Sequence, residues 1–276
     1  MEIISSRQNP TIVKICKLSD KKHRDAEGLF RFDGVKLCAE AILSGVELEI
    51  VLIRKDRCDE VGRRIHELCG KYPEDTGARI LVLENSLFDT VSEEKSPEGV
   101  ISVGKYIDKF HKIATINNDD PEICFGSDRV MLLEDIRDPG NLGTIMRSAA
   151  ALGIDTLVLC GDCADIYNSK AVRGSMGALF RINTLRIRDG AKAVEAIRKG
   201  GRRVFAAALS QDAVSLDDMA LSAGDCIVIG NEGHGLSSTI LSACDGCVII
   251  PMSAGSESLN AATAAAIFMW EMRKTK

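Results

Sequence analysis

Short apolar runs alternate with helical patterns through the first hundred residues of the chain. Four runs have the length of buried strands, and these are Leu29–Phe32, Leu48–Ile53, Ile80–Leu83 and Val100–Val103. Helical periodicity covers Val35–Leu43 and Asp59–Leu68. The alternation predicts a small α/β/α layered domain over residues 1–105.

A second alternating series begins at Arg129. It contains six apolar runs separated by helical patterns: Val130–Leu133, Thr156–Leu159, Thr184–Ile187, Val204–Ala208, Cys226–Ile229 and Cys247–Ile250. Strands with interposed helices predict a mostly parallel sheet covered on both faces. Between the two series the periodicity is lost around the polar run Asn117–Pro121. We therefore predict a linker over residues 106–128 and a second α/β domain over residues 129–276.

Composition narrows the class of protein. The 276 residues are 45% hydrophobic and 27% charged, which is typical of globular domains. The apolar stretch Leu259–Trp270 is interrupted by Asn260 and Thr263 and is too short for a bilayer, so no membrane span is expected. The start MEIISSRQNP lacks a secretory signal, which predicts a cytoplasmic protein whose ten cysteines are reduced thiols. A net charge of −5 argues against non-specific coating of nucleic acid, so any RNA contact must be local.

The most basic stretch of the chain is Thr11–Arg24. Its apolar positions give it one helical face, and Lys14, Lys17, Lys21, Lys22 and Arg24 give it a basic one. Charge runs usually only keep a helix face in solvent. A surface that faces RNA is the alternative, and both interpretations stay open at this point.

The loops that follow strands carry the candidate chemistry, because ligands of open α/β sheets bind at the carboxyl ends of the strands. After the first strand of the second series, Asp138-Pro139-Gly140-Asn141 forms a turn, and the helix that follows carries Arg147. The amide of Asn141 and the guanidinium of Arg147 have the chemistry to converge on one anionic group. A capped helix with an incidental arginine is the alternative.

Two further loops stand out. The strand Cys226–Ile229 runs into GNEGHGLS (Gly230–Ser237), whose glycines allow backbone to approach a ligand closely and whose turn carries Glu232. The last strand runs into a segment with Ser256, Ser258 and Asn260, and a helix that is apolar nearly all round follows it. Ser258 fits a helix N-cap and a functional role equally well. The chain has neither the G-x-G-x-x-G nor the G-x-x-x-x-G-K-[ST] motif, which argues against NAD and ATP.

These three loops together resemble a known family. DPGNLGTIMRSAAALG, VIGNEGHGLS and IPMSAGSESLNAATA resemble the three ordered motifs of the SpoU (TrmH-like) RNA 2′-O-ribose methyltransferases, and the likeness extends from Arg129 to the C-terminus. ISSRQNPTIVKICKL with LFRFDG resembles the substrate-binding domain of many members, which is akin to ribosomal RNA-binding proteins. Asp33 stands where that domain usually has Glu, and Glu98 where Gln is commoner. This second likeness strengthens the interpretation of Thr11–Arg24 as a surface that faces RNA.

The resemblance implies a SPOUT-type α/β domain whose C-terminal chain is threaded into a trefoil knot, which general folding rules do not predict. It implies S-adenosylmethionine as the cofactor, held by Leu209, Gly230, Ile250 and Leu259. It assigns Arg147 as the base that accepts the 2′-hydroxyl proton, with Asn141 orienting it. Because a guanidinium has a pKa above about 12, a second version keeps Arg147 charged against phosphate and developing alkoxide. In that version Glu232, Ser258 or Asn260 completes the geometry.

The function implied is methylation of a ribose 2′-hydroxyl, in ribosomal RNA rather than transfer RNA, because some members acting on transfer RNA lack a substrate-binding domain. Transfer RNA stays an alternative. Methylation of a base nitrogen disagrees with the Ser-Leu-Asn signature. A catalytically silent RNA-binding or ribosome-assembly protein is a further alternative, which the joint presence of all five polar candidates opposes. A homodimer is expected from the resemblance and from the apolar C-terminal helix.

The sequence also holds two C-x-x-C pairs, Cys160–Cys163 and Cys244–Cys247. Paired C-x-x-C motifs hold zinc in compact ribbons, but these pairs lie much too far apart in the chain for one. The four histidines, His23, His66, His111 and His234, are scattered and form no metal-binding spacing. We expect no metal.

Overall fold

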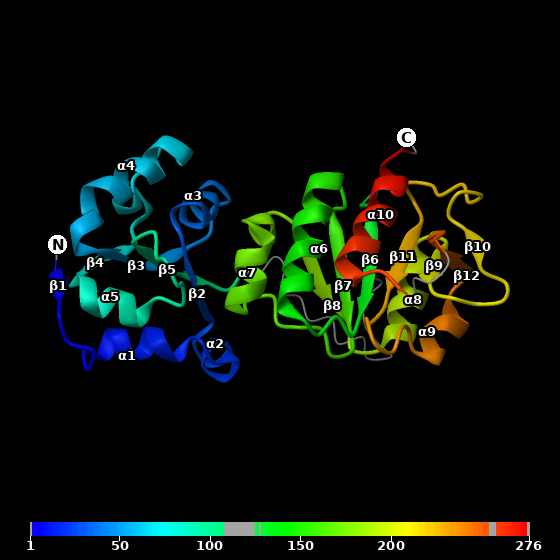
Figure 1. Cartoon of the computed structure of the whole chain (residues 1–276), viewed down its shortest axis with the longest axis horizontal. Helices are drawn as coiled ribbons and strands as arrows, with labels where there is room; N and C mark the ends of the chain where they lie inside the picture. The colour runs from blue at the N-terminus through cyan, green and yellow to red at the C-terminus, as the bar shows by residue number, and fades with distance from the viewer. Residues whose placement is uncertain (1, 108–124, 127, 254–257, 275–276) are drawn as a thin grey trace. The chain divides into compact units, whose positions relative to one another are not determined.

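The computed structural model describes residues 2–107, 125–126, 128–253 and 258–274 (Figure 1). Most of the predicted linker, together with His111 and Ser256, lies outside these residues. Contacts divide the chain into two compact units, the first comprising Met1–Ile107 with Asp165–Arg181 and the second Asp108–Ala164 with Ile182–Lys276. Within the described ranges, no helix is both long enough and apolar enough to cross a membrane.

A five-stranded mixed sheet forms the centre of the first unit, in the order β1-β4-β3-β5-β2. Its strands are β1 (Glu2–Ile4), β2 (Leu29–Asp33), β3 (Leu48–Arg54), β4 (Arg79–Leu83) and β5 (Val100–Lys105). β4 is parallel to β1 and β3, whereas β5 is antiparallel to β2 and β3. The four strands expected from the sequence are all present, and β1 is an addition.

Helices cover both faces of this sheet (Figure 1). α1 (Pro10–Lys17) and α5 (Asn85–Val91) bury Ile12, Ile15 and Phe88 against the strands on one face. α3 (Val35–Leu43) and α4 (Cys58–Cys69) pack together on the other, and the short 3-10 turns η1 (Lys55–Arg57) and η2 (Pro73–Thr76) complete the unit. The layered α/β/α domain predicted from the sequence is therefore confirmed.

The basic stretch Thr11–Arg24 folds as two helices, α1 and α2 (Lys21–Glu27). The chain bends between them because Asp20 takes an extended conformation and its carboxylate accepts a hydrogen bond from the Lys22 amide at 2.9 Å. Asp20 is thus the N-cap of α2, which ends at Gly28 in the left-handed region.

The segment Asp165–Arg181 falls in the range 129–276, yet its contacts group it with the first unit. It carries α7 (Ser169–Ser175) and η4 (Ala178–Phe180). The Tyr167 ring lies 4.5 Å from the Phe30 ring of β2, centroid to centroid, and the Phe180 ring lies 5.5 Å from that of Phe32. These buried aromatic contacts make β2 the strand on which the segment packs.

The second unit is built on a seven-stranded sheet in the order β10-β12-β9-β11-β6-β7-β8, and every pairing in it is parallel. The strands are β6 (Val130–Glu134), β7 (Thr156–Cys160), β8 (Asn183–Arg186), β9 (Val204–Ala207), β10 (Val214–Ser215), β11 (Cys226–Ile229) and β12 (Gly246–Ile249). The prediction of a parallel sheet from six runs is confirmed, and β10 is an additional short strand. The trefoil knot stays a prediction.

Helices flank this sheet as well. α8 (Gly190–Lys199) and α9 (Ser238–Ala243) share one core with the strands, in which Val158, Val194 and Ile240 are fully buried. α6 (Pro139–Leu152) packs against α10 (Ala261–Lys274), and α10 also contacts β11. Both α6 and α10 begin just after loops at the carboxyl ends of strands, so their first residues border the region where a ligand site is expected.

Candidate active site

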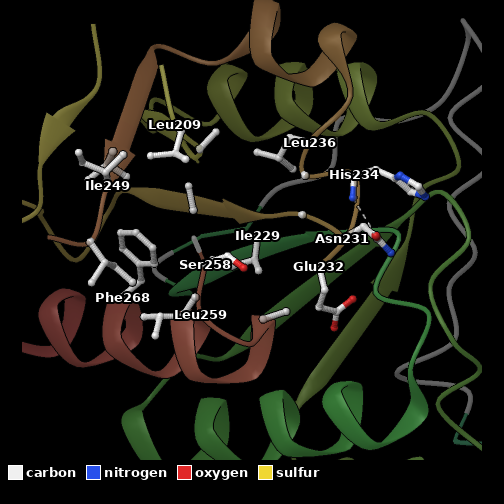
Figure 2. Close-up of a pocket in the computed structure, with 18 of the residues that line it drawn as sticks. Leu209, Ile229, Asn231, Glu232, His234, Leu236, Ile249, Ser258, Leu259 and Phe268 are labelled. Atoms are coloured by element: carbon white, nitrogen blue, oxygen red, sulfur yellow. Dashed lines mark hydrogen bonds between the residues drawn. The ribbon is translucent and has the colours of Figure 1, made fainter. Parts of the chain in front are cut away.

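A cavity of about 410 Å³ lies where β9, β11 and β12 end side by side (Figure 2). Four segments form its wall: residues 207–209 after β9, residues 229–236 after β11, residues 248–252 around the end of β12, and residues 258–268 leading into α10. All four predicted cofactor residues line this cavity, namely Leu209, Gly230, Ile250 and Leu259. Residues far apart in sequence thus share one hollow, as the rule for parallel sheets predicts.

Small and apolar side chains dominate the wall. Alanines line it at two of the four segments, and Ile229, Leu236 and Phe268 supply its larger apolar surface (Figure 2). Gly230 is required by packing, because a Cβ added there would lie 2.6 Å from the carbonyl oxygen of Gly235. The two ends of the loop therefore approach each other more closely than a side chain at position 230 would allow.

Asn231 organises the loop between Gly230 and Leu236. Its Nδ2 donates to the carbonyl oxygen of Asp135 at 2.9 Å, and its Oδ1 accepts from the amides of Gly233 at 2.8 Å and His234 at 3.2 Å. The backbones of Asn231 and Gly235 also exchange hydrogen bonds at 3.1 and 3.0 Å. Asn231 is not among the residues predicted from the sequence, although an asparagine in a glycine-rich turn is a known signal for side-chain-to-backbone bonding.

Glu134 anchors the other end of the same loop. Its carboxylate accepts from the Ser237 amide at 2.8 Å and from the Ser237 hydroxyl at 2.7 Å. Ser237 is also the N-cap of α9 and accepts from the Ile240 amide at 3.4 Å. Because Glu134 is the last residue of β6, this contact ties the first strand of the unit to the start of α9. Glu134 was likewise not singled out from the sequence.

Three of the predicted catalytic residues meet at the edge of the cavity. Asn141 Nδ2 donates to the carboxylate of Glu232, and Asn260 Nδ2 donates to Asn141 Oδ1 at 3.0 Å. Each comes from a different motif: Asn141 from the first turn of α6, Glu232 from the loop after β11, and Asn260 from the residue before α10. The continuous chain of hydrogen bonds fixes the orientation of the Asn141 amide.

Asn260 also settles which residue caps α10. Its Oδ1 accepts from the amides of Ala262 at 2.9 Å and Thr263 at 3.3 Å, which is the bonding expected of an N-cap. The interpretation of Ser258 as the cap is therefore wrong, because the helix begins two residues later than that interpretation needs. Ser258 lines the cavity instead, on its exposed rim (Figure 2).

Arg147 lies on α6, six residues after Asn141, with an exposed side chain. It is not among the residues that line the cavity, and it makes no hydrogen bond or ion pair with any residue that the structure describes. The structure thus brings together four of the five predicted catalytic residues, and leaves the guanidinium of Arg147 available to a partner from solvent.

The cysteine pairs have the chemistry of core residues. Burial raises the pKa of Cys163 to about 11 and that of Cys244 to about 12, and burial also raises the pKa of Cys160. The Cys163 thiol donates to the carbonyl oxygen of Cys160 at 3.2 Å. In the described part of the chain, no group of three or more His, Cys, Asp or Glu side chains is placed to hold a metal ion.

Comparison with known proteins gives consistent results. Residues 128–270 match the family model described as "SpoU rRNA Methylase family", and residues 9–102 match the "MRM3-like substrate binding domain". A 23S rRNA (guanosine(2553)-2′-O)-methyltransferase of Bacillus subtilis is 30% identical over 99% of this chain and 100% of its own length. The crystal structure of an AdoMet-bound rRNA methyltransferase from Sinorhizobium meliloti is 25% identical, covers 99% of this chain and 97% of its own, and has a TM-score of 0.81. The AdoMet complex of the SpoU methyltransferase AviRb from Streptomyces viridochromogenes is 26% identical, with a TM-score of 0.77 over 96% and 98% of the two chains.

Proposed function

Because the chain belongs to the SpoU rRNA methylase family, we propose that it transfers a methyl group from S-adenosylmethionine to a ribose 2′-hydroxyl of RNA, and of ribosomal RNA in particular. One observation carries the proposal. Asn141, Glu232 and Asn260, which come from three separate motifs, are hydrogen-bonded in series beside a cavity lined by Gly230, the loop after β11 and the start of α10.

The cavity suits this cofactor. A volume of about 410 Å³ lies within the range of ligand pockets, roughly 300 to 1,000 Å³. Its glycines and alanines bring backbone amides and carbonyls close to a ligand, and Leu209, Ile250 and Leu259 offer apolar contact to a flat ring. When bound, the cofactor supplies an electrophilic methyl group on a sulfonium. The residues 1–105 serve, in this proposal, to hold the RNA.

The residues of the chain then position the acceptor. The Asn141 amide, fixed between Glu232 and Asn260, orients the ribose, and alignment of the reacting atoms supplies much of the acceleration. Arg147 either accepts the 2′-hydroxyl proton or stays charged, binds the adjacent phosphate and stabilises the developing oxyanion. The Arg147 side chain is exposed and has no partner among the described residues, which favours the second version, because it is free to contact a phosphate of the RNA.

Substitution of Arg147 tests the proposal. We expect Arg147→Ala to lose at least about a hundredfold in methyl transfer, the usual cost of removing one stabilising donor, while the affinity for S-adenosylmethionine is unchanged. Methyl transfer is measured with labelled cofactor and ribosomal RNA, and cofactor affinity by calorimetry. Near wild-type turnover by Arg147→Ala would refute the role of this residue.

The arginine-to-lysine substitution separates the two versions of the mechanism. A lysine is more easily deprotonated than an arginine, so activity of Arg147→Lys that rises steeply with pH supports proton abstraction. A pH-independent residual activity supports electrostatic stabilisation. Ribose methylation mapped on RNA from cells with and without the gene identifies the nucleotide, and it distinguishes ribosomal RNA from transfer RNA as substrate. No difference in any RNA would support the catalytically silent alternative.

The proposal extends to assembly and location. α10 keeps Trp270 48% exposed although Phe268, Met269 and Met272 on the same helix are buried, and exposed tryptophan is typical of protein interfaces. We therefore propose a homodimer. The likeness to rRNA methyltransferases supports, as a further proposal, a location in the cytoplasm. Sedimentation velocity at micromolar concentration tests the dimer, and a monomer that remains fully active would overturn it.

A further inference from the structure

The loop before α1, α1 itself and the start of α2 carry a group of cations that have no partner in the described part of the chain. Arg7, Lys17, Lys21 and Lys22 are all exposed, and their side chains make no hydrogen bond or ion pair with the described residues. We call these four residues and the hollow between them the α1–α2 surface. It lies on the α1 side of the first unit's sheet, away from α3 and α4 (Figure 1).

Several other cations of the same unit are neutralised by carboxylates. Arg54 bonds Asp56 and Asp89 at 3.0 Å each, Lys55 bonds Glu84 at 2.7 Å, and Arg64 lies 3.3 Å from Glu98. The whole chain has a net charge of −5. What distinguishes Arg7, Lys17, Lys21 and Lys22 is that four cations without a carboxylate partner among the described residues lie on one loop and two consecutive helices, and such a surface attracts polyanions.

The structure also separates the free cations of the basic stretch from those with structural roles. Arg24 is 3% exposed, donates to the carbonyl oxygens of Leu18 and Ser19 at 2.8 and 2.7 Å, and pairs with Asp165 at 2.7 Å. Lys14 pairs with Glu27 at 2.7 Å. The sequence pattern alone gave these residues the same weight as Lys17, Lys21 and Lys22.

Between the free cations lies a hollow of about 440 Å³. It is lined by Arg7, Val13, Cys16, Lys17, Ser19, Asp20 and His23. Val13 is 39% exposed and, with Cys16, provides an apolar floor, while Arg7 and Lys17 are the cations of a rim that also carries Asp20. An unstacked base has the flat apolar face that such a floor accepts, and the phosphates on either side of it match the cations at the rim.

The fold holds this surface in place without using the four cations. Ile12, Ile15 and Leu18 anchor α1 in the core, Asn9 caps α1 through the Thr11 amide at 2.9 Å, and Asp20 caps α2. Substitutions at Arg7, Lys17, Lys21 and Lys22 therefore leave the core and both caps intact.

We propose that the α1–α2 surface binds a single-stranded segment of the RNA substrate, with its phosphates on Arg7, Lys17, Lys21 and Lys22 and a base over Val13. The inference rests on the proposed function for its biological meaning. The binding itself is sequence-independent, because phosphate contacts carry no base information.

The test compares two sets of variants in which glutamine, a neutral polar residue, replaces a cation. The first replaces Arg7, Lys17, Lys21 and Lys22 with Gln, together and in pairs. The control replaces Lys36 and Lys71, which are exposed cations of α3 and of the residues after α4, on the other side of the sheet. Fluorescence anisotropy measures binding to a labelled oligouridine of about 16 nucleotides, a length that spans such a groove, from roughly 50 to 200 mM salt.

We expect the fourfold variant to lose about tenfold or more in affinity at low salt. The slope of log K against log salt should become shallower by about 3, since each phosphate contact to a single strand contributes roughly 0.7. Lys21→Gln with Lys22→Gln should give about half of that change, while the control pair should leave the slope unaltered. Val13→Ser should weaken binding with no change in slope, because it removes apolar contact and no charge.

Several results would overturn the inference. These are undetectable binding of oligouridine by the wild-type protein at low salt, an equal loss for the control pair, and stronger binding to phosphatidylserine vesicles than to RNA. Calorimetry with S-adenosylmethionine separates this failure from that of the proposed function. If the wild-type protein and the fourfold variant methylate RNA equally well, the proposed function stands and the proposed RNA-binding surface is refuted. If the wild-type protein binds RNA through these cations but methylates no RNA, the proposed surface stands and the proposed function is refuted.

Discussion

Removal of the Asn231 side chain should loosen the cofactor cavity without unfolding the domain. This side chain makes three hydrogen bonds, to the carbonyl oxygen of Asp135 and to the amides of Gly233 and His234. Each is worth about 0.5 to 1.5 kcal/mol net. The site is partly exposed, so water replaces some of the lost hydrogen bonds. The Asn231 side chain therefore stabilises the closed conformation of the loop by about 2 kcal/mol.

If the cofactor binds only the closed loop, that free energy appears in its affinity. Asn231→Ala should weaken S-adenosylmethionine binding by about 10- to 30-fold, because 1.4 kcal/mol corresponds to a factor of ten. Asn231→Asp keeps the acceptor for Gly233 and His234 but turns a carboxylate toward the carbonyl oxygen of Asp135, so its affinity should also fall. Calorimetric titration measures both variants.

A control variant isolates the effect from general destabilisation. Asn183→Ala changes an exposed asparagine of the edge strand β8 in the same unit and should leave cofactor affinity unaltered. Thermal melts show whether each variant remains folded at the temperature of the titration. An Asn231→Ala protein that binds the cofactor within about twofold of wild type would refute the view that this side chain holds the loop.

Three further outcomes are expected. Gly230→Ala should abolish cofactor binding in calorimetry, because its Cβ would lie 2.6 Å from the carbonyl oxygen of Gly235; unchanged affinity would show that the loop has slack. Asn260→Ala should lower the free energy of unfolding by about 1 kcal/mol and reduce methyl transfer, because it removes the N-cap of α10 and the donor to Asn141. Asn260→Asp should keep the cap and lose only the donor to Asn141. Equal stability of the two variants in urea melts would contradict the role of Asn260 as the cap. Burial raises the pKa of Cys163 to about 11, so between about pH 8.5 and 11 the folded protein keeps a proton that the unfolded chain loses. The free energy of unfolding should fall there with rising pH, and Cys163→Ala should flatten the fall by up to about 1.4 kcal/mol per pH unit; an identical slope in both proteins would refute the shift.

Local pattern determined much of this protein. The six runs of the second series all appear as strands, with ends that agree within about one or two residues, because burial on both faces gives parallel strands continuous apolar sequence. The short strands β1 and β10 escaped detection because three or two residues carry too little periodicity. The loops after the strands were identified as ligand-binding for the same reason, since parallel strands place their carboxyl ends at one edge.

Only the tertiary structure decided which side chains meet. The contact of Asn260 with Asn141 joins residues 119 positions apart, and that of Arg24 with Asp165 joins residues 141 positions apart. Local periodicity records whether a position is buried, not which distant residue buries it. For this reason the sequence identified Asn141, Glu232 and Asn260 as candidates without their order of bonding, and it treated Arg24 as one more surface cation. The tertiary contacts separate Arg24 and Lys14, which pair with carboxylates, from Lys17, Lys21 and Lys22, which have no partner among the described residues.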